Sequence, residues 1–160
     1  PVLSTEKDGA LSTPDLVESA RSLLLPLTTI LTPNIFEVHA LAPGSDTPAA
    51  AAMSLLETNC EYVLLTGTHG KTRDVVHTLY GNHRELSRFS FERLPHKYHG
   101  SGCTLAASLA AMMTTEPEVE NAVHQALAYT HKTLVHGKRI GMGQYHPDRF
   151  FWTRQKTGDE

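Results

Sequence analysis

The residues with the clearest chemical potential form the short run Gly100, Ser101, Gly102 and Cys103. Glycine carries no Cβ, so this turn can fold tightly and its backbone can come close to a ligand. The following residues, through Met112, are rich in alanine and leucine and contain no Gly or Pro, so we expect a helix from Cys103 onward. The unpaired N–H groups at a helix start bind anions, of which phosphate is the usual one.

Cys103 stands at the mouth of this predicted anion site. The positive end of a helix dipole favours the thiolate form of a cysteine, which can accept a proton or act as a nucleophile. A structural interpretation is equally open for the motif alone: Ser101 caps a core helix and Cys103 is buried. The four residues therefore do not by themselves decide between a phosphate site and an ordinary helix start.

Asn34 and Glu37 form a second candidate group. They are three positions apart at the start of a predicted helix over 34–41, so they share one face of its first turn. Side-chain oxygens of this kind can hold a hydrated Mg²⁺ at the end of a buried strand. The alternative is a helix cap, in which Asn34 and Glu37 bond the first backbone N–H groups.

Thr66 and Gly67 end the clearest strand of the chain, which we expect over residues 61–67 as a buried apolar run. Strands alternating with helices predict a three-layer α/β fold with a mostly parallel sheet and a two-stranded antiparallel addition. In such folds ligands bind beyond the carboxyl ends of the strands. We therefore expect Asn34, Thr66 and the Gly100 turn on one rim of the sheet.

The remaining helices and strands are predicted from helix-cap residues, turn residues and the spacing of apolar residues. A helix should begin at Thr13 and Pro14 and end at Pro26. Four of its residues recur at helical spacing and should form one packed apolar face: Leu16, Ala20, Leu23 and Leu24. We further expect a strand tail at 1–3, a strand at 28–31, helices at 47–57 and 114–136, and strands at 75–80 and 86–93 joined by a turn at 81–83.

Composition narrows the classes of function. The chain has 160 residues, a formal net charge of −3 and no basic run, which argues against nucleic acid and anionic membrane surfaces as partners. It contains no apolar run of membrane-spanning length. Its two cysteines stand in unrelated contexts, and its ten histidines form no zinc-binding motif. We expect a cytoplasmic enzyme acting on a small molecule.

Three spaced motifs occur together: Thr32-Pro33-Asn34-x-x-Glu37, Leu64-Leu65-Thr66-Gly67 and His99 to Leu105. In this combination the chain resembles the hydroxymethylpyrimidine/phosphomethylpyrimidine kinases of thiamine biosynthesis, which belong to the ribokinase-like superfamily. The start at Pro1-Val2 and the glycine-rich tail from Ile140 also resemble that family. Most of the superfamily has Asp where this chain has Cys103, and cysteine there is a mark of the pyrimidine kinases.

The resemblance implies ATP-dependent phosphorylation of 4-amino-5-hydroxymethyl-2-methylpyrimidine and its monophosphate, with Mg²⁺. It also implies a role for each candidate residue. Cys103 would take the substrate's hydroxyl proton, and the backbone of Gly100, Ser101, Gly102 and Cys103 would hold the transferring phosphoryl group. The nucleotide would be bound by Thr66, Gly67 and Asn34, while Glu37 and Asn34 would orient Mg²⁺ and its waters.

The resemblance covers one kinase domain in part. Residues 1–152 match its C-terminal, nucleotide and catalytic part, and 153–160 form a polar tail. The N-terminal portion that carries much of the pyrimidine pocket is not in this sequence, so we expect the native protein to be longer, and a homodimer when full length. We also expect this chain alone to bind substrate poorly.

Two other functions remain open. A pyridoxal or pyridoxine kinase shares the scaffold and a similar ring-hydroxymethyl substrate. A non-catalytic nucleotide-binding module is the alternative from another class, because half of the expected domain is missing from the sequence. Turnover of the two vitamin precursors separates the kinases, and nucleotide binding without turnover would identify the module.

Overall fold

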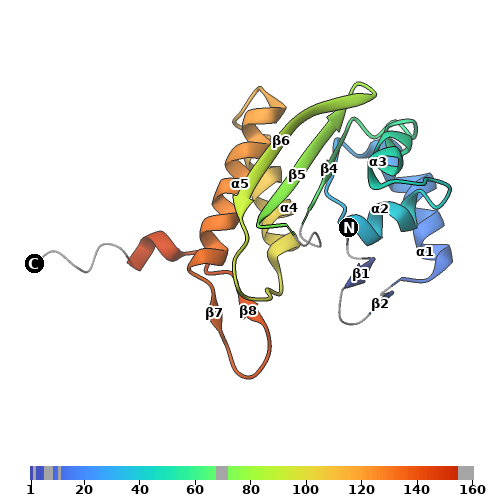
Figure 1. Ribbon diagram of the computed structural model, residues 1–160. Coiled ribbons are helices and arrows are strands. Elements are labelled where there is room, and N and C mark those ends of the chain that lie inside the picture. Colours follow the sequence, from blue (N-terminus) through green and yellow to red (C-terminus); the bar gives the residue numbers. More distant parts are fainter. Residues whose placement is uncertain (2, 6–8, 11, 68–71, 155–160) are drawn as a thin grey trace, which may run out of the picture. The chain divides into compact units, whose positions relative to one another are not determined.

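The computed structural model describes residues 1, 3–5, 9–10, 12–67 and 72–154 (Figure 1). The chain forms two compact units, 1–91 and 92–160. In the described part of the chain, no helix has the length and apolar character that a bilayer crossing demands.

The first unit is built around a four-stranded sheet of order β3-β4-β5-β6: Ile30–Leu31, Tyr62–Leu65, Asp74–Gly81 and Arg84–Glu92. β3 and β4 are parallel, with Ile30 opposite Tyr62, whereas β4 and β5 are antiparallel, with Leu64 opposite Leu79. The α/β class is confirmed, but the sheet within this chain is mixed rather than mostly parallel.

The turn between β5 and β6 adopts the conformation that a two-residue hairpin needs. Asn82 and His83 have φ of 50° and 54°, the left-handed region that matches the twist of the flanking strands. The hairpin expected at this point is confirmed. Of the strand tail expected at residues 1–3, residue 2 lies outside the described residues, and Pro1 and Leu3 are not in a strand. The first strand, β1 (Ser4–Thr5), pairs antiparallel with β2 (Gly9–Ala10).

Two helices pack with β3 and β4 to form the core of this unit. α2 (Ile35–Leu41) and α3 (Pro48–Leu56) contact each other, and α3 contacts β4 and β5. Ala51 and Ala52 of α3 are fully buried, so the alanine-rich face allows the close packing expected of small side chains. The large side chains that fill this core include Val38, Leu41, Leu55 and Val63.

The first helical segment begins as expected but packs differently. Thr13 caps α1 (Pro14–Ser19) by accepting a hydrogen bond from the N–H of Leu16, and the chain continues through a π-helical turn (Ala20–Leu24) into a 3₁₀ turn (Leu25–Leu27). The π turn changes the spacing of the side chains within it, so Leu23 and Leu24 lose the face counted at 3.6 residues per turn. The predicted packed face was wrong: Leu16, Leu23 and Leu24 are 53–67% exposed, and Leu25 is the buried residue.

The second unit is a helical hairpin followed by a short two-stranded sheet. α4 (Ser101–Met112) packs on α5 (Val119–Val135), and β7 (Lys138–Arg139) pairs antiparallel with β8 (Tyr145–His146) before a final 3₁₀ turn (Phe151–Arg154). α5 begins five residues later than predicted, at Val119 after Glu118. Its end before Gly137 is as predicted.

Candidate functional site

The start of α4 is set by Gly100, not by Ser101 or Cys103. Gly100 is the N-cap residue with φ of +86°, a left-handed conformation that glycine adopts without strain. Its carbonyl accepts hydrogen bonds from the N–H and the hydroxyl of Thr104, at 3.0 and 2.8 Å. The helix therefore begins two residues earlier than predicted, and the interpretation of Ser101 as its cap was wrong.

The N–H groups of Ser101, Gly102 and Cys103 begin this helix. None of the three has a hydrogen-bond acceptor among the residues that the structure describes. They are the unpaired donors that the sequence predicts for this turn, and the dipole of a 12-residue helix adds positive potential to them. Gly102 has open space where a side chain would stand, so a group can approach the backbone here.

Cys103 is exposed to solvent, at the third position of α4. This contradicts the structural interpretation in which Cys103 is buried. The other cysteine, Cys60, is 2% exposed, and burial raises the pKa of its thiol. The two thiols therefore differ in access, and Cys103 is the one that a substrate or reagent can reach.

Sequence reasoning missed Arg149, which lies at the same turn. Its Nε donates a 3.0 Å hydrogen bond to the hydroxyl oxygen of Thr104. Its Nη2 lies 3.2 Å from the point where a Cβ on Gly100 would stand. The contact joins residues 45 positions apart, so no local pattern in the sequence marks it.

Asn34 and Glu37 form a capping box at the start of α2. The Asn34 Oδ1 accepts from the N–H groups of Phe36 and Glu37, both at 2.9 Å, and Glu37 Oε2 accepts from the N–H of Asn34 at 2.9 Å. Glu37 Oε1 accepts from the N–H of Leu3 at 3.2 Å, and its side chain is 4% exposed. The capping alternative is thus what the structure shows.

A metal role for the same pair remains a proposal. Each Glu37 oxygen accepts one of these hydrogen bonds and keeps a further lone pair, so the donor chemistry fits a hard cation or its waters. Over the described ranges, no Lys or Arg forms an ion pair with Glu37. No group of three or more His, Cys, Asp or Glu side chains with metal-binding geometry occurs in those ranges either.

Thr66 lies beside Asn34, as the sequence predicts for the ends of two neighbouring parallel strands. The N–H of Thr66 donates to the carbonyl of Pro33 at 2.9 Å, and Thr66 and Asn34 form an isolated parallel bridge. The next residue, Gly67, has no room for a side chain, because a Cβ would stand 1.8 Å from the carbonyl oxygen of Val76. Gly67 thus lets β4 and β5 approach at this edge.

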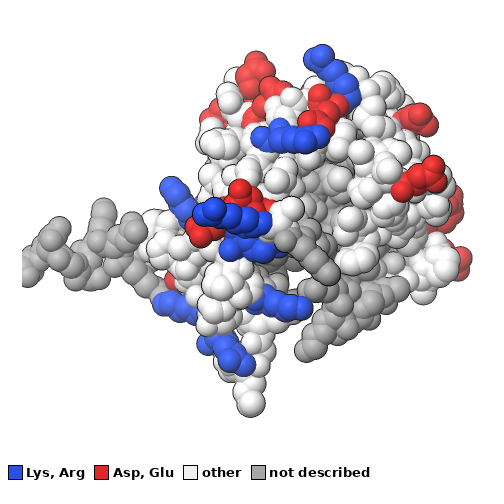
Figure 2. Space-filling view, viewed as in Figure 1, with Lys and Arg blue, Asp and Glu red and all other residues white. Residues whose placement is uncertain are grey.

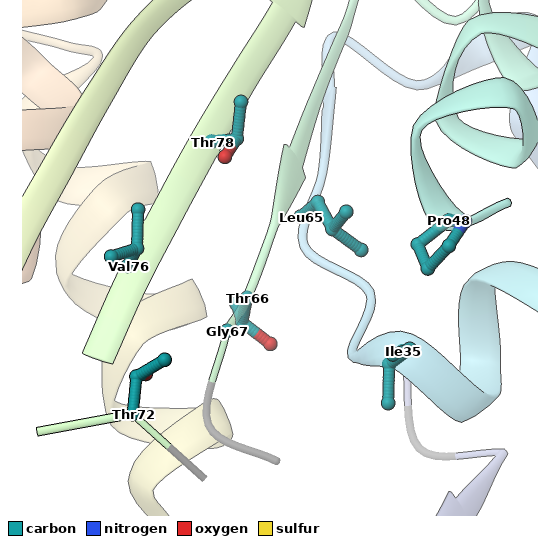
Figure 3. Close-up of a pocket in the computed structure, with 8 residues that line it drawn as sticks. All are labelled: Ile35, Pro48, Leu65, Thr66, Gly67, Thr72, Val76 and Thr78. Atoms are coloured by element: carbon teal, nitrogen blue, oxygen red, sulfur yellow. The ribbon is translucent and has the colours of Figure 1, made fainter. Parts of the chain in front are cut away.

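A pocket of about 290 Å³ opens at this edge of the first unit (Figure 3). It lies where β4 ends and where α2 and α3 begin, since Ile35 and Pro48 are the first residues of those helices. Two of the residues predicted to bind the nucleotide, Thr66 and Gly67, line it. Its other lining residues are Leu65, Thr72, Val76 and Thr78.

The candidate residues thus form two groups. Asn34, Glu37, Thr66 and Gly67 gather in the first unit, and the Gly100 turn with Cys103 belongs to the second. That both groups share one rim stays a prediction.

Acidic and basic side chains are interspersed with neutral surface on the face shown in Figure 2, and no continuous basic band crosses the described part of that face.

Solved structures with a similar fold include pyridoxal kinases and a phosphomethylpyrimidine kinase of Clostridium difficile. The pyridoxal kinase of Staphylococcus aureus in complex with ADP has a TM-score of 0.83 and 23% identity, covering 94% of this chain and 57% of that one. The ADP complex of Bacillus subtilis pyridoxal kinase has a TM-score of 0.79 and 24% identity, covering 86% and 55%. These similarities establish the ribokinase-like fold.

Curated relatives carry the name hydroxymethylpyrimidine/phosphomethylpyrimidine kinase. The protein of Rhizobium meliloti is 31% identical over 150 residues, and that of Salmonella typhimurium is 32% identical over 161 residues. The matches cover 90% and 94% of this chain but 56% and 60% of the relatives, so the chain spans somewhat over half of their length. The model of the family described as phosphomethylpyrimidine kinase matches residues 1–148. With nearly the whole chain matched, this protein belongs to the phosphomethylpyrimidine kinase family.

Proposed function

We propose that the protein phosphorylates 4-amino-5-hydroxymethyl-2-methylpyrimidine and its monophosphate with ATP, in thiamine biosynthesis. Family membership supports this proposal, as do the names of the curated relatives. The observation that carries it is the start of α4, where three unpaired N–H groups and the exposed thiol of Cys103 lie within one turn. Phosphoryl transfer needs positioning and charge neutralisation more than covalent chemistry from the protein, and this turn supplies both.

In the proposed mechanism Cys103 acts as a general base. Its thiolate accepts the proton of the substrate's hydroxymethyl group, whose oxygen attacks the γ-phosphorus of ATP. The bond between that phosphorus and the bridging oxygen breaks, and ADP leaves with the electron pair. The N–H groups of Ser101, Gly102 and Cys103 hold the oxygens of the phosphoryl group during the transfer. A covalent thiophosphate is not required, because a base within hydrogen-bonding reach of the hydroxyl suffices.

Nucleotide binding is assigned to the edge of the first unit. Thr66 and Gly67 line its pocket and Asn34 lies beside Thr66. The hydroxyl of Thr66 donates to the carbonyl of Pro33 at 3.2 Å, a long hydrogen bond that it can exchange for one to a phosphate oxygen. Similar kinases crystallised with ADP and with AMP-PCP support the use of ATP.

Asn34 and Glu37 would hold Mg²⁺ through its water ligands, which suits a carboxylate already engaged by two backbone N–H groups. When bound, the ion would neutralise charge on the nucleotide phosphates. The capping box fixes the orientation of both side chains and leaves a lone pair on each Glu37 oxygen, whereas Asn34 Oδ1 already accepts two hydrogen bonds. The remaining expectations, one kinase domain over 1–152, a cytoplasmic location and a homodimer when full length, are part of the same proposal.

Pyridoxal kinase activity is the second candidate, because pyridoxal kinases are among the solved structures with a similar fold. The assay that separates the two measures turnover of each substrate by the purified protein with ATP and Mg²⁺. We expect kcat/KM for the hydroxymethylpyrimidine to exceed that for pyridoxal by at least about tenfold. A preference for pyridoxal would replace the proposal by the alternative. Nucleotide binding without turnover of either would identify a non-catalytic module.

A further inference from the structure

Arg149 lies against the glycine turn, held there by a side-chain hydrogen bond. Its Nε donates to Thr104, the residue that also closes the first turn of α4 on the carbonyl of Gly100. Its Nη2 lies 3.2 Å from the position of a hypothetical Cβ on Gly100. The guanidinium therefore occupies space beside the turn that a side chain at position 100 would need.

The backbone that carries Arg149 is fastened to α5. The hydroxyl of Tyr129 donates to the Arg149 carbonyl at 3.1 Å, and the N–H of Asp148 donates to the carbonyl of Thr133 at 2.9 Å. Pro147, directly before them, is buried. Arg149 is exposed, but its backbone and its Nε are both held by hydrogen bonds. It therefore loses less conformational entropy on binding a ligand than an ordinary surface arginine does.

The positive charge of Arg149 has no carboxylate partner in the part of the chain that the structure describes. The neighbouring Asp148 faces Lys138, with 3.9 Å between Oδ2 and Nζ, and accepts the N–H of Phe150 through Oδ1. Thr104 uses its hydroxyl as donor to Gly100 and as acceptor from Arg149. What remains at the turn are donors: the free guanidinium N–H groups and the three backbone N–H groups that begin α4.

We propose that Arg149 contacts the phosphoryl group transferred in the reaction proposed above. This inference rests on that reaction and adds a positive residue to it. The planar guanidinium offers paired N–H groups with the geometry of phosphate oxygens, and it keeps its charge throughout. Arg149 exchanges no proton during the step, since the hydroxyl proton goes to Cys103 and the electron pair of the broken bond leaves with ADP. Its contribution is to stabilise the charge on the phosphoryl oxygens.

A purely structural role is the competing explanation, in which Arg149 only ties the C-terminal segment to α4. The two roles differ in what a variant changes. A tether affects thermal stability, whereas a phosphoryl contact affects kcat in a protein that still folds. Lysine at this position keeps the charge but loses the paired N–H geometry, so it should restore activity in part only if the charge acts on the ligand.

The test compares Arg149→Gln, Arg149→Lys and the control Arg139→Gln in the purified protein. Arg139 is a matched control because it is another arginine of the same C-terminal segment, and its guanidinium is used by the carbonyls of Met142 and Gly143. We expect Arg149→Gln to lower kcat by about tenfold to hundredfold, the usual effect of losing a charged hydrogen bond. Arg149→Lys should recover part of that loss, and Arg139→Gln should stay within about twofold of the original protein.

A second readout does not depend on turnover. A phosphate at the Gly100 turn would shield Cys103 from iodoacetamide, so protection by inorganic pyrophosphate reports binding there. Arg149→Gln should raise the pyrophosphate concentration that gives half-maximal protection at least about fivefold, and Arg139→Gln should leave that concentration unchanged. Normal turnover and normal protection in Arg149→Gln would overturn the inference and leave the proposed kinase function standing. Protection that depends on Arg149 in a protein without turnover would uphold the anion contact and reject the kinase.

Discussion

Cys103 and Cys60 show how position gives the same side chain different chemistry. Cys103 is exposed at the start of α4, while Cys60 is 2% exposed in the core of the first unit and its Sγ donates to the carbonyl of Tyr62 at 3.2 Å. Burial raises the pKa of the Cys60 thiol, so little of it is ionised near neutral pH. Only Cys103 combines access with a location at the predicted phosphate site.

This difference predicts selective alkylation. Since the thiolate is the reactive form, native protein treated with iodoacetamide at neutral pH should be modified at Cys103 at least about tenfold faster than at Cys60. Raising the pH should increase the rate at Cys60 only above the pH at which an ordinary thiol ionises, because burial raises the pKa of the Cys60 thiol. Peptide mass spectrometry over time measures both rates, with urea-unfolded protein as the control in which they should converge. Equal rates in the native state would contradict this picture.

At the scale of the element, the start of α2 combines a structural role with a proposed functional one. Asn34 caps the helix in the same way that Thr13 caps α1, by accepting backbone N–H groups. Only the Asn34 cap includes a buried carboxylate, Glu37. Substitutions at Thr13 and Asn34 can therefore be compared to separate the effect of losing a helix cap from the effect of losing a metal site.

Asn34→Ala and Thr13→Ala should each lower the free energy of unfolding by about 1 kcal/mol, the usual cost of losing an N-cap. Urea denaturation measures this effect. Only Asn34→Ala should also raise the Mg²⁺ concentration that gives half-maximal activity, by about tenfold or more, because the Asn34 cap holds the turn that orients the proposed Glu37 ligand. If the Mg²⁺ requirement of both variants matched that of the original protein, Asn34 would be a cap alone.

Local signals predicted the elements well where the deciding interaction lies within a few residues. The caps at Thr13 and Asn34 and the left-handed turn at Asn82 and His83 are such cases. The prediction failed for the apolar face of the first helical segment, since a π turn shifts its register in a way that residue spacing does not reveal. α4 began earlier than predicted because the left-handed Gly100, rather than a polar side chain, starts it.

The candidate site was predicted unevenly for a similar reason. The neighbouring positions of Asn34 and Thr66 follow from a rule of parallel strands, and the structure has them paired. Arg149 was missed because its contact with Thr104 spans 45 residues and depends on how the C-terminal segment folds back on α4 and α5. Motifs therefore located the backbone N–H groups of the proposed phosphate site, while the arginine proposed for that site was found only from the coordinates.

At the scale of the whole molecule, the chain contains two groups of residues that the proposed reaction must use together. The edge proposed to bind the nucleotide, with Asn34, Thr66 and Gly67, belongs to the first unit, and the Gly100 turn belongs to the second. The chain matches 56–60% of the length of the relatives named above. We propose that the reaction uses both groups, with ATP bound by the first and the proton acceptor for the substrate's hydroxyl group supplied by the second.

The most direct test of this account is the turnover of Cys103→Ala with ATP, Mg²⁺ and the hydroxymethylpyrimidine. Cys60→Ala is the control, because it removes the other thiol of the chain. We predict that kcat falls at least about a hundredfold in Cys103→Ala, the contribution expected of a general base, while Cys60→Ala keeps the turnover of the original protein. Full kcat in a folded Cys103→Ala protein would contradict the central claim that this thiol accepts the substrate's proton.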